Sequence, residues 1–277
     1  DCVALSPAMK RIVADADRLG TRGSLNVLIR GETGVGKDII ARLLHEKVGT
    51  PNRPFVAVNC AAIPETLVEA TLFGYEKGAF TGAQSARAGK FELANGGDIF
   101  LDEVATLIPP IQAKLLRVIE SGEVDRLGST IVRRVKFRVL AATSEPLAEM
   151  VRDGRFRQDL YERIAGLELI IPPLRERRED LAGLIAKFVA ENGGLIIPRE
   201  MTRIFELYPW PGNIRELRKV IEVVATLSHG RQADLSALPK KILDAFAGDA
   251  TGSQPDGSFS WHAGEPLDQA ETRFFGA

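Results

Sequence analysis

The chain has 277 residues, of which 45% are hydrophobic and 26% are charged, and its formal net charge is −1. This composition predicts a globular protein with one large domain or two unequal ones, and the balanced charge gives no indication of a nucleic-acid groove or a membrane-surface patch. The two cysteines and three histidines are scattered, so we expect neither a disulfide framework nor a metal-ligand cluster, and we expect the reducing cytoplasm as the compartment.

Short apolar runs alternate with amphipathic stretches up to about residue 175. The runs rich in Val and Ile predict strands at 25–30, 55–58, 99–103, 137–143 and 166–174. Helical periodicity predicts helices between them, at 38–48, 64–74, 108–122 and 153–164. Because strands alternate with helices, we predict an α/β fold with a five-stranded parallel sheet that is covered on both faces.

The pattern becomes helical only after about residue 176, with helices predicted at 178–193, 198–208 and 213–230. The stretch 248–266 is rich in Gly, Ser, Asp and Pro and is typical of a linker. We therefore predict three parts: an α/β subdomain, a smaller all-α subdomain, and a linker with the start of a further domain. Their predicted ranges are 1–175, 176–247 and 248–277.

The segment GETGVGKD at 31–38 fits the spacing G-x-x-x-x-G-K between a predicted strand and a predicted helix, which is the context that a P-loop requires. Its glycines let backbone N–H groups face the phosphates of ATP, and Lys37 is expected to reach the β and γ phosphates. A plain glycine-rich turn is the alternative. Asp38 stands where a P-loop usually has the Ser or Thr ligand of Mg²⁺, so the metal must use other groups, including water. The candidate nucleotide-binding residues are Gly31, Glu32, Thr33, Gly34, Val35, Gly36, Lys37 and Asp38.

The segment EKGAFTGA at 76–83 is a glycine-rich loop that carries a phenylalanine. Gly78 and Gly82 disfavour a regular helix or strand, because glycine loses the most backbone entropy on ordering. They allow a sharp bend, so we expect Phe80 and Thr81 at an exposed tip. An exposed aromatic side chain suggests a partner, and the alternative is a Phe80 that folds down into the core. The six candidate partner-binding residues are Gly78, Ala79, Phe80, Thr81, Gly82 and Ala83.

The run IFLDE at 99–103 predicts an apolar strand that ends in Asp102 and Glu103. The carboxyl end of a central strand is where α/β sheets place ligands. We expect Asp102 to hold Mg²⁺ through water and Glu103 to polarise the water that attacks the γ phosphate. An ordinary strand end with two solvated carboxylates is the alternative, and the P-loop motif favours the catalytic interpretation.

Two basic segments follow. Arg157 and Arg163 lie six residues apart on the helix predicted at 153–164, and from this spacing alone a solvated cationic face is favoured over a pair of arginine fingers. In WPGNIREL at 210–217, Asn213 is the expected N-cap and Arg215 lies in the first helical turn. A cation at that end opposes the helix dipole, which suggests an anionic partner, whereas a surface arginine is the alternative.

These segments together resemble the central AAA+ ATPase domain of the bacterial enhancer-binding proteins, which activate sigma-54 RNA polymerase. GAFTGA at 78–83 matches the hallmark loop of that family in full, and the P-loop, LDE and WPGNIREL accompany it. The resemblance runs from about Ser6 to about residue 245. It implies an AAA+ P-loop fold with a helical lid, hydrolysis of ATP with Mg²⁺, and a homo-oligomeric ring, expected to be a hexamer, that remodels the polymerase from a closed to an open promoter complex.

The resemblance also implies roles for the acidic and polar residues of the site. Lys37 matches the Walker A lysine of the family, and Asp102 and Glu103 match its Walker B pair. Asn59 matches the asparagine that holds the catalytic glutamate inactive until the target engages. Thr143 matches the threonine of the sensor that follows the fourth strand.

The same resemblance favours the arginine-finger interpretation of Arg157 and Arg163 over a solvated cationic face. Arg157 and Arg163 match the arginine fingers that act on the nucleotide of a neighbouring subunit, and Arg215 matches the sensor arginine of the lid. Residues 78–83 match the loop that contacts sigma-54. The segment 121–130 resembles a second loop that moves with the first.

The sequence departs from the family at one site position and at both ends. Ser144 stands where the family usually has Asn or His, so γ-phosphate sensing is expected to be altered. The first residue is Asp1 rather than Met, which we interpret as an excised or processed piece. We expect DNA to be contacted only through a domain absent from this chain, and no membrane association.

Two other functions are compatible with parts of the pattern. A protein-unfolding or clamp-loading motor of the same superfamily also uses an aromatic pore loop, but the complete GAFTGA argues against it. A nucleotide-dependent switch that does not hydrolyse ATP has no need of a water-activating carboxylate, so Glu103 argues against that function.

Overall fold

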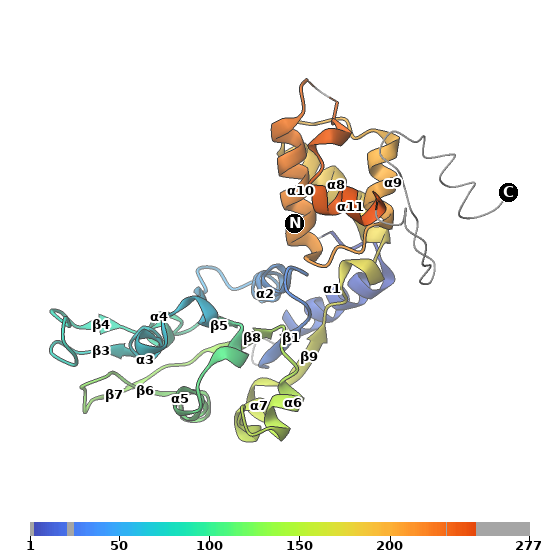
Figure 1. Ribbon diagram of the computed structural model, residues 1–277. Coiled ribbons are helices and arrows are strands. Elements are labelled where there is room, and N and C mark those ends of the chain that lie inside the picture. The colour runs from blue at the N-terminus through green and yellow to red at the C-terminus, as the bar shows by residue number, and fades with distance from the viewer. Residues whose placement is uncertain (1–2, 21–24, 231, 248–277) are drawn as a thin grey trace. The chain divides into compact units, whose positions relative to one another are not determined.

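The computed structural model describes residues 3–20, 25–230 and 232–247. The chain divides into two compact units between Pro173 and Leu174, the first α/β and the second helical (Figure 1). The segment 248–277, predicted as a linker and the start of another domain, lies outside the described residues. None of the helices in the described part of the chain is both long and apolar enough to cross a membrane.

The first unit is built on a five-stranded sheet with the order β2-β5-β8-β1-β9, and every neighbouring pair in it is parallel. This confirms the predicted parallel sheet. The last strand ends at Ile170, earlier than predicted, because Pro172 and Pro173 have no N–H to donate to a ladder. The strands are β1 (Val27–Arg30), β2 (Phe55–Asn59), β5 (Asp98–Asp102), β8 (Arg138–Thr143) and β9 (Leu167–Ile170).

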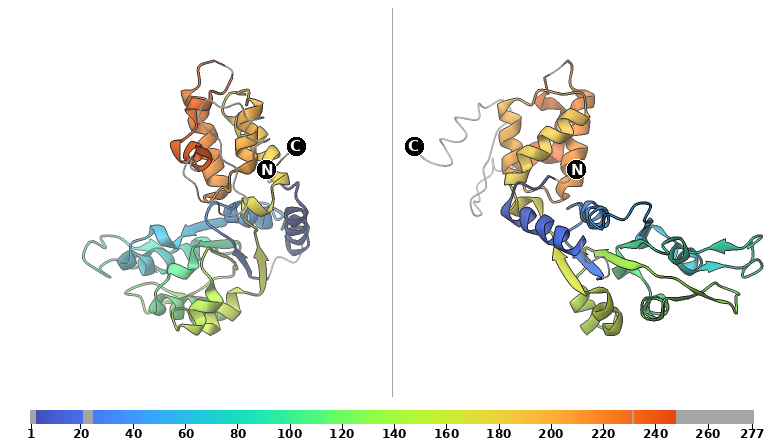
Figure 2. Two further views of the ribbon diagram at one scale, coloured as in Figure 1. Left: turned by 45° about the vertical axis from the view of Figure 1, so that its right-hand side comes forward. Right: turned by 180° about the vertical axis from the view of Figure 1, so that it is seen from behind.

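Helices cover both faces of this sheet (Figure 2). Successive side chains of a strand point to opposite faces, and β1 demonstrates this: Leu28 joins one buried cluster, and Val27 and Ile29 join the other. The cluster of Val27 includes side chains of α1 (Pro7–Gly20) and α2 (Lys37–Glu46). The opposite cluster includes side chains of α3 (Glu65–Phe73), α4 (Lys90–Leu93), α5 (Pro109–Ser121), α6 (Leu147–Arg152) and α7 (Gln158–Ile164).

Two short antiparallel hairpins extend from the first unit and lie side by side. One pairs β3 (Gly74–Tyr75) with β4 (Arg87–Ala88), and the other pairs β6 (Glu123–Asp125) with β7 (Val132–Arg134). Backbone hydrogen bonds join them, from Glu76 N to the Leu127 carbonyl at 2.9 Å and from Leu127 N to the Gly74 carbonyl at 2.9 Å. The sequence patterns predicted neither hairpin.

One predicted helix is shorter than expected. The segment 153–164 was expected to be helical throughout, but α6 ends at Arg152 and α7 begins at Gln158. Gly154 has a positive φ of 71°, which interrupts the helix. Arg157 is extended at the N-cap of α7, and its N–H donates to Gln112 Oε1 at 2.8 Å. Arg157 therefore precedes the helix and Arg163 lies in its last turn.

A buried ion cluster lies at the amino-terminal end of β5. The Asp98 side chain is fully buried, and it accepts hydrogen bonds from Arg53 at 2.7 Å and Arg138 at 2.8 Å and contacts His45 Nδ1 at 2.7 Å. Burial alone raises the pKa of Asp98, but the hydrogen bonds from Arg53, Arg138 and His45 outweigh it and hold that pKa below its usual value. The cluster ties together α2, β5 and β8 at the edge opposite the P-loop.

The second unit is helical, as predicted. Its helices are α8 (Glu179–Glu191), α9 (Arg199–Leu207), α10 (Asn213–Leu227) and α11 (Lys240–Ala247). Asn213 was expected to be the N-cap of its helix, but Gly212 holds that position and the Asn213 side chain is used elsewhere. Its Oδ1 accepts from Leu174 N at 2.8 Å, and its φ is 53°. This hydrogen bond connects the start of the unit to α10. The left-handed backbone of Asn213 is one that Asn tolerates better than most residues.

Candidate functional site

The P-loop connects β1 to α2 at the carboxyl edge of the sheet. Gly31, Gly34 and Gly36 have positive φ values of 155°, 82° and 99°. A Cβ on Gly31 would lie 2.7 Å from the Ile171 carbonyl oxygen, so only glycine fits there. Gly36 is the N-cap of α2, so the free N–H groups of that helix start face the loop. This arrangement is suited to an anion such as phosphate.

Lys37 points back across the loop that it follows. Its Nζ donates to the Gly31 carbonyl at 2.9 Å and to the Glu32 carbonyl at 3.4 Å, and the side chain is 7% exposed. The same Nζ lies 3.3 Å from Glu103 Oε1. The cation expected at the phosphates and the carboxylate expected at the attacking water are therefore neighbours.

Glu103 follows β5 with a φ of 51°, in the left-handed region. Its Oε2 accepts hydrogen bonds from Ser144 N at 3.1 Å and Ser144 Oγ at 3.0 Å. Thr106 Oγ1 donates to the Glu103 carbonyl at 2.8 Å. Both the backbone and the carboxylate of Glu103 are held in place, and a non-glycine residue kept at positive φ is typical of functional sites.

Asp102 ends β5 directly before Glu103. Its Oδ1 accepts from Glu103 N at 3.1 Å. Burial, together with the nearby charge of Glu103, raises the pKa of Asp102 in spite of the opposing effect of Lys37. A carboxylate in such a position gains from a cation. Among the described residues no group of three or more His, Cys, Asp or Glu side chains is arranged to hold a metal by itself.

Asn59 lies on β2, where it pairs in register with Asp102. Its Oδ1 accepts from Ala62 N at 3.2 Å and caps the short helix Cys60–Ala62. The resemblance gave Asn59 the role of holding the catalytic glutamate inactive until the target engages, and in this structure Ser144 donates to the Glu103 carboxylate. The Asn59 oxygen caps its own turn, and Ser144 follows β8 directly beside β5.

Thr143 is buried at the end of β8, and its Oγ1 accepts from Glu145 N at 3.0 Å. The hydroxyl thus stabilises the turn that carries Ser144. Of these two residues, the exposed Ser144 is the one that contacts Glu103.

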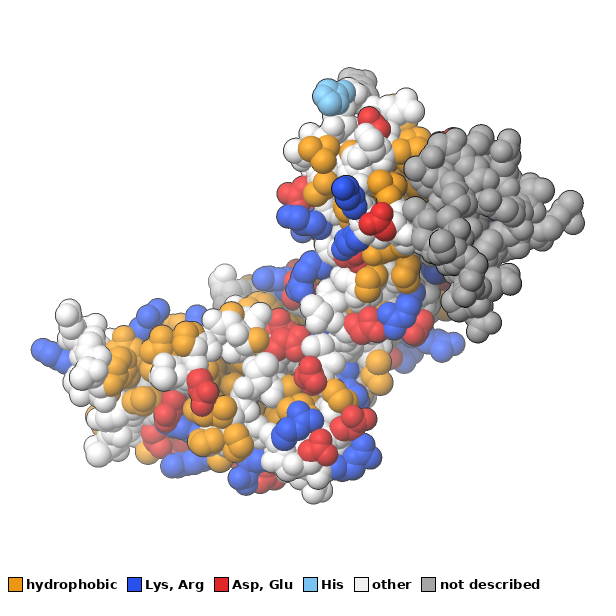
Figure 3. Space-filling model, viewed as in Figure 1, with side chains coloured by type: hydrophobic (Ala, Val, Ile, Leu, Met, Phe, Trp, Pro, Cys, Tyr) orange, Lys and Arg blue, Asp and Glu red, His pale blue; other side chains and the backbone are white. Residues whose placement is uncertain are grey.

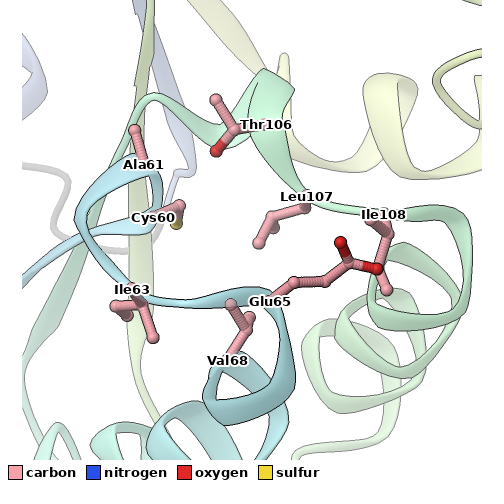
Figure 4. A pocket seen from close by; sticks show the side chains of 8 residues that line it. All are labelled: Cys60, Ala61, Ile63, Glu65, Val68, Thr106, Leu107 and Ile108. Atoms are coloured by element: carbon pink, nitrogen blue, oxygen red, sulfur yellow. The ribbon is translucent and has the colours of Figure 1, made fainter.

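A pocket of about 220 Å³ lies between the segments 60–68 and 106–108 (Figure 4). The buried Cys60 thiol is in its wall, and burial together with the charges of Asp102 and Glu103 raises the pKa of Cys60 to about 12. The thiol therefore stays protonated and unreactive at neutral pH. The lining residues are Cys60, Ala61, Ile63, Glu65, Val68, Thr106, Leu107 and Ile108.

The two arginines expected as fingers are both exposed on the first unit. Arg157 forms a two-pronged ion pair with Asp159, with distances of 3.0 Å and 2.7 Å. This pairing raises the pKa of Arg157. Arg163 lies in the last turn of α7, and its carbonyl accepts from Asn26 Nδ2 at 3.0 Å. Exposure leaves both guanidinium groups accessible to a neighbouring molecule.

The segment 78–83 forms the tip of the hairpin β3–β4. Gly78 N donates to the Ala83 carbonyl at 2.9 Å, and Gly78 and Gly82 have positive φ values of 84° and 101°. Phe80 is 38% exposed and its ring packs edge-on against Tyr75 with centroids 5.0 Å apart. Thr81 is also exposed. The expected exposed tip is present, and Phe80 does not enter the core.

Ion pairs join the two hairpins behind this tip. Arg126 contacts both oxygens of Glu92 at 2.7 Å and lies 3.3 Å from Glu76. Arg133 lies 2.8 Å from Glu76. Burial alone raises the pKa of Glu92, but the bond from Arg126 outweighs it and lowers that pKa. A Cβ on Gly128 would lie 3.1 Å from Ala79 Cβ, so the hairpins also touch near the tip.

Arg215 is exposed in the first turn of α10, in the second unit. Acidic and basic side chains are interspersed over the visible face of the molecule (Figure 3). This distribution agrees with the small net charge.

Comparison with known families identifies the chain. A family model described as the sigma-54 interaction domain matches residues 2–170, more than half of the sequence. The chain belongs to this family. A second model, the AAA+ ATPase lid domain, matches residues 175–254. The chain is thus an AAA+ ATPase domain of the sigma-54 activator type together with its lid, and the resemblance drawn from its motifs is confirmed.

Relatives of this sigma-54 interaction domain are regulatory proteins. The Nif-specific regulatory protein of Bradyrhizobium diazoefficiens is 48% identical over 235 residues, which are 83% of this chain and 40% of that protein. The transcriptional regulatory protein XylR of Pseudomonas putida is 46% identical over 257 residues, which are 90% of this chain and 45% of that protein. The chain therefore spans less than half the length of these relatives.

Solved structures also share the fold. The crystal structure of NtrX from Brucella abortus in complex with ADP superposes with a TM-score of 0.83 and 30% identity, covering 99% of this chain and 62% of that one. The structure of the same protein with ATP gives a TM-score of 0.82 and 31% identity, covering 99% and 61%. The AAA+ fold predicted for this chain is confirmed.

Proposed function

We propose that this sigma-54 interaction domain hydrolyses ATP in a homo-oligomeric ring, with the hexamer as the expected form, and uses the energy to remodel sigma-54 RNA polymerase from a closed to an open promoter complex. The observation that carries the proposal is the exposed tip with Phe80 and Thr81 on the same compact unit as the Lys37–Glu103 pair. A contact surface and a hydrolytic site on one compact unit are what such a motor requires. The proposed compartment is the cytoplasm.

ATP is the proposed ligand of the P-loop. The backbone N–H groups of residues 31–38 would face its phosphates, and Lys37 would move from Glu103 to the β and γ phosphates. Asp102 is the proposed ligand of Mg²⁺ because its carboxylate lies near Lys37 and Asp38 of this loop, whose charges act on it. Mg²⁺ in such sites uses one or two carboxylates together with phosphate oxygens and water. When bound, the metal would neutralise phosphate charge.

The hydrolytic step is assigned to Glu103. Its carboxylate would orient a water molecule toward the γ phosphate and accept the developing proton. Lys37 would stabilise negative charge on the phosphate oxygens as the bond to the leaving ADP lengthens. Arg157 and Arg163 would add positive charge from the neighbouring subunit, and Arg215 of the lid would act as the sensor arginine that the resemblance assigns to it.

Coupling to the polymerase is assigned to the paired hairpins. The ion pairs of Arg126 and Arg133 with Glu76 and Glu92 support the idea that the tip and the second hairpin move together. We propose that residues 78–83 contact sigma-54 when the γ phosphate is in place and withdraw after its release.

A protein-unfolding motor is the second candidate. Hsp104 in a complex with casein superposes with a TM-score of 0.58 at 16% identity, which shows a shared fold and no more. An exposed aromatic loop such as that of Phe80 would serve either motor. The complete GAFTGA favours the sigma-54 function.

One experiment separates these functions. The purified chain is mixed with isolated sigma-54 or with an unfolded model protein such as casein, in the presence of ADP and aluminium fluoride as a transition-state mimic. Our proposal predicts stable binding to sigma-54 and ATP turnover by the chain. Binding to the unfolded protein alone would support the second candidate, and absence of turnover would reject both motors.

A further inference from the structure

Gln112 is an amide that lies among the buried side chains of the first unit. It is near the start of α5 and is fully buried. Its Nε2 donates to the Leu107 carbonyl at 2.7 Å and to the Arg155 carbonyl at 3.1 Å, and its Oε1 accepts from Arg157 N at 2.8 Å. A nitrogen that faces two carbonyls and an oxygen that faces an N–H fix the orientation of the amide. A buried amide costs free energy unless it is hydrogen-bonded, so these three bonds compensate for its burial.

The Leu107 carbonyl belongs to the turn that follows Glu103. Glu103 is the N-cap of the short helix Val104–Thr106, and Leu107 is its C-cap. Thr106 N and Thr106 Oγ1 both donate to the Glu103 carbonyl, at 3.1 Å and 2.8 Å, and Leu107 N donates to the Val104 carbonyl at 3.2 Å. Short hydrogen bonds therefore connect the carbonyl that Gln112 contacts to the backbone of Glu103.

The other two partners of Gln112 belong to the segment that presents Arg157. Arg157 is extended, with φ −73° and ψ 133°, and its side chain is exposed. Arg155 N and Phe156 N donate to the Met150 carbonyl at 2.8 Å and 3.1 Å, and the Phe156 side chain is buried. Gln112 adds one bond before Phe156 and one bond after it. The backbone from which the exposed guanidinium extends is thus held from inside the core.

We propose that Gln112 is a positioning residue for Arg157, and that it couples the turn after Glu103 in one subunit to the arginine which that subunit offers to its neighbour. The inference rests on the proposed action of Arg157 across subunits. A shift of the turn displaces the Leu107 carbonyl, and the same amide passes the displacement to the backbone on both sides of Phe156. Because a misplacement of about 1 Å can cost about 10²-fold in rate, a small shift is enough to change the action of Arg157.

The test begins with Gln112→Met, which keeps the length of the side chain and removes the three hydrogen bonds. We expect kcat for ATP to fall by about 10²-fold, less than the roughly 10³-fold expected for loss of the arginine itself. KM should stay within about twofold of the wild type, because Gln112 does not hold the nucleotide. Gln232→Met, the same change at an exposed glutamine of the second unit, is the matched control and should match the wild type.

Gln112→Glu is the conservative variant. Burial favours its protonated acid, which can accept from Arg157 N and donate to one of the two carbonyls. Its kcat should therefore fall by only about tenfold, the scale of one lost hydrogen bond. Melting temperature shows which variants are folded, and Gln112→Glu replaces Gln112→Met in the experiments below if the latter does not fold.

Mixed rings show on which site Gln112 acts. Gln112→Met has an intact P-loop and a misplaced Arg157, whereas Lys37→Ala has a defective P-loop and an intact Arg157. Mixing these two variants should restore turnover, because the site of the first then receives the arginine of the second. Mixing Gln112→Met with Arg157→Ala should restore none, because neither subunit supplies a working arginine. The pair Arg157→Ala with Lys37→Ala is the positive control for subunit exchange.

The inference is overturned if folded Gln112→Met keeps wild-type kcat. It is also overturned if Arg157→Ala rescues Gln112→Met and Lys37→Ala does not, since that result would place the effect at Glu103 of the same subunit. Rescue by neither variant, while the positive control is active, would mean that Gln112 only supports the fold. If Arg157→Ala by itself keeps wild-type turnover, the proposed finger fails instead, and if the wild type does not hydrolyse ATP, the proposed function fails.

Discussion

Lys37 Nζ lies 3.3 Å from Glu103 Oε1, and both side chains are largely shielded from solvent. A phosphate at the P-loop would compete with Glu103 for this lysine. Nucleotide binding would then weaken the ion pair and free one carboxylate oxygen at the moment when it is needed. Binding of a phosphate to Lys37 is therefore coupled to release of the Glu103 carboxylate from its ion pair.

This link predicts the behaviour of Glu103→Gln. The amide keeps the size of the side chain but lacks the charge that orients and deprotonates water, so turnover should fall by at least about 10²-fold. ATP binding should be retained or tightened, because Lys37 loses a competing carboxylate. Equilibrium binding of a fluorescent ATP analogue and steady-state phosphate release measure the two effects. Near-normal phosphate release from the variant would reject the role.

The arginine pair predicts catalysis across a subunit interface. Replacing Arg157 or Arg163 by Ala should cut turnover by roughly 10³-fold, as the loss of a trans-acting finger does. Mixing either variant with Lys37→Ala should restore some activity, because each supplies what the other lacks at a shared interface. Arg152→Ala, at an arginine whose side chain is 74% exposed, is the control and should stay active. Failure of rescue while subunits demonstrably exchange would argue against trans action.

The buried ion cluster predicts a pH-dependent contribution to folding. The pKa of Asp98 is lowered in the folded state, so its contribution to the free energy of unfolding is present above the unfolded pKa of about 4 and is lost as pH falls through the folded value. Asp98→Asn leaves the buried Arg138 and the half-buried Arg53 without their counter-ion and should cost about 3–5 kcal/mol at pH 7.

Thermal unfolding of wild type and Asp98→Asn between pH 7 and pH 3 measures this contribution. The difference in melting temperature should be largest at neutral pH and should shrink below about pH 4. Glu149→Gln, at an exposed carboxylate, serves as the control with little effect at any pH. A difference that stays constant with pH would contradict the assigned role of Asp98.

The link between the hairpins predicts that they open together. Arg126→Ala removes the contacts to Glu92 and Glu76, so backbone amide hydrogen exchange should become faster in both 74–88 and 123–134. Arg134→Ala is a matched control on the same hairpin, since that side chain is 87% exposed. An increase confined to 123–134 would mean that the hairpins are not coupled through Arg126.

Much of the first unit was predictable from the sequence, because its buried strands are short runs of Val, Ile and Leu between amphipathic helices. The P-loop and the acidic pair were also predictable, since each combines a fixed spacing with its strand. The hairpins were missed because β3 and β4 are only two residues long and have no periodicity. Their stability comes from contacts between distant segments, such as Tyr75 with Leu127.

The candidate site shows the same limit. The contact between Ser144 and Glu103 depends on the register between β5 and β8 and on the turn after Thr143. The spacing of residues along the sequence indicates neither this register nor this turn. The departure from the family at Ser144 was the one signal that pointed to this position. The helix boundary at Arg157 was missed because the bond to Gln112 comes from another part of the chain.

The position of Phe80 predicts a small effect on folding. The ring is 38% exposed and contacts Tyr75, so Phe80→Ala should cost about 1 kcal/mol, the scale of one aromatic pair. Phe73, which is fully buried and stacks on Phe91 at 5.5 Å, provides the contrast. Phe73→Ala should cost about 3–5 kcal/mol. Chemical denaturation measures the free energy of unfolding of both variants. Equal losses in the two variants would contradict this account of the tip.

The most direct test of the central claim is binding of isolated sigma-54 to the wild type, Phe80→Ala and Thr81→Ala in the presence of ADP and aluminium fluoride. The account predicts that the wild type forms a stable complex, and that both variants lose it while they keep ATP turnover and a melting temperature close to that of the wild type. Wild-type affinity for sigma-54 in either folded variant would contradict the claim that this exposed tip is the contact with sigma-54.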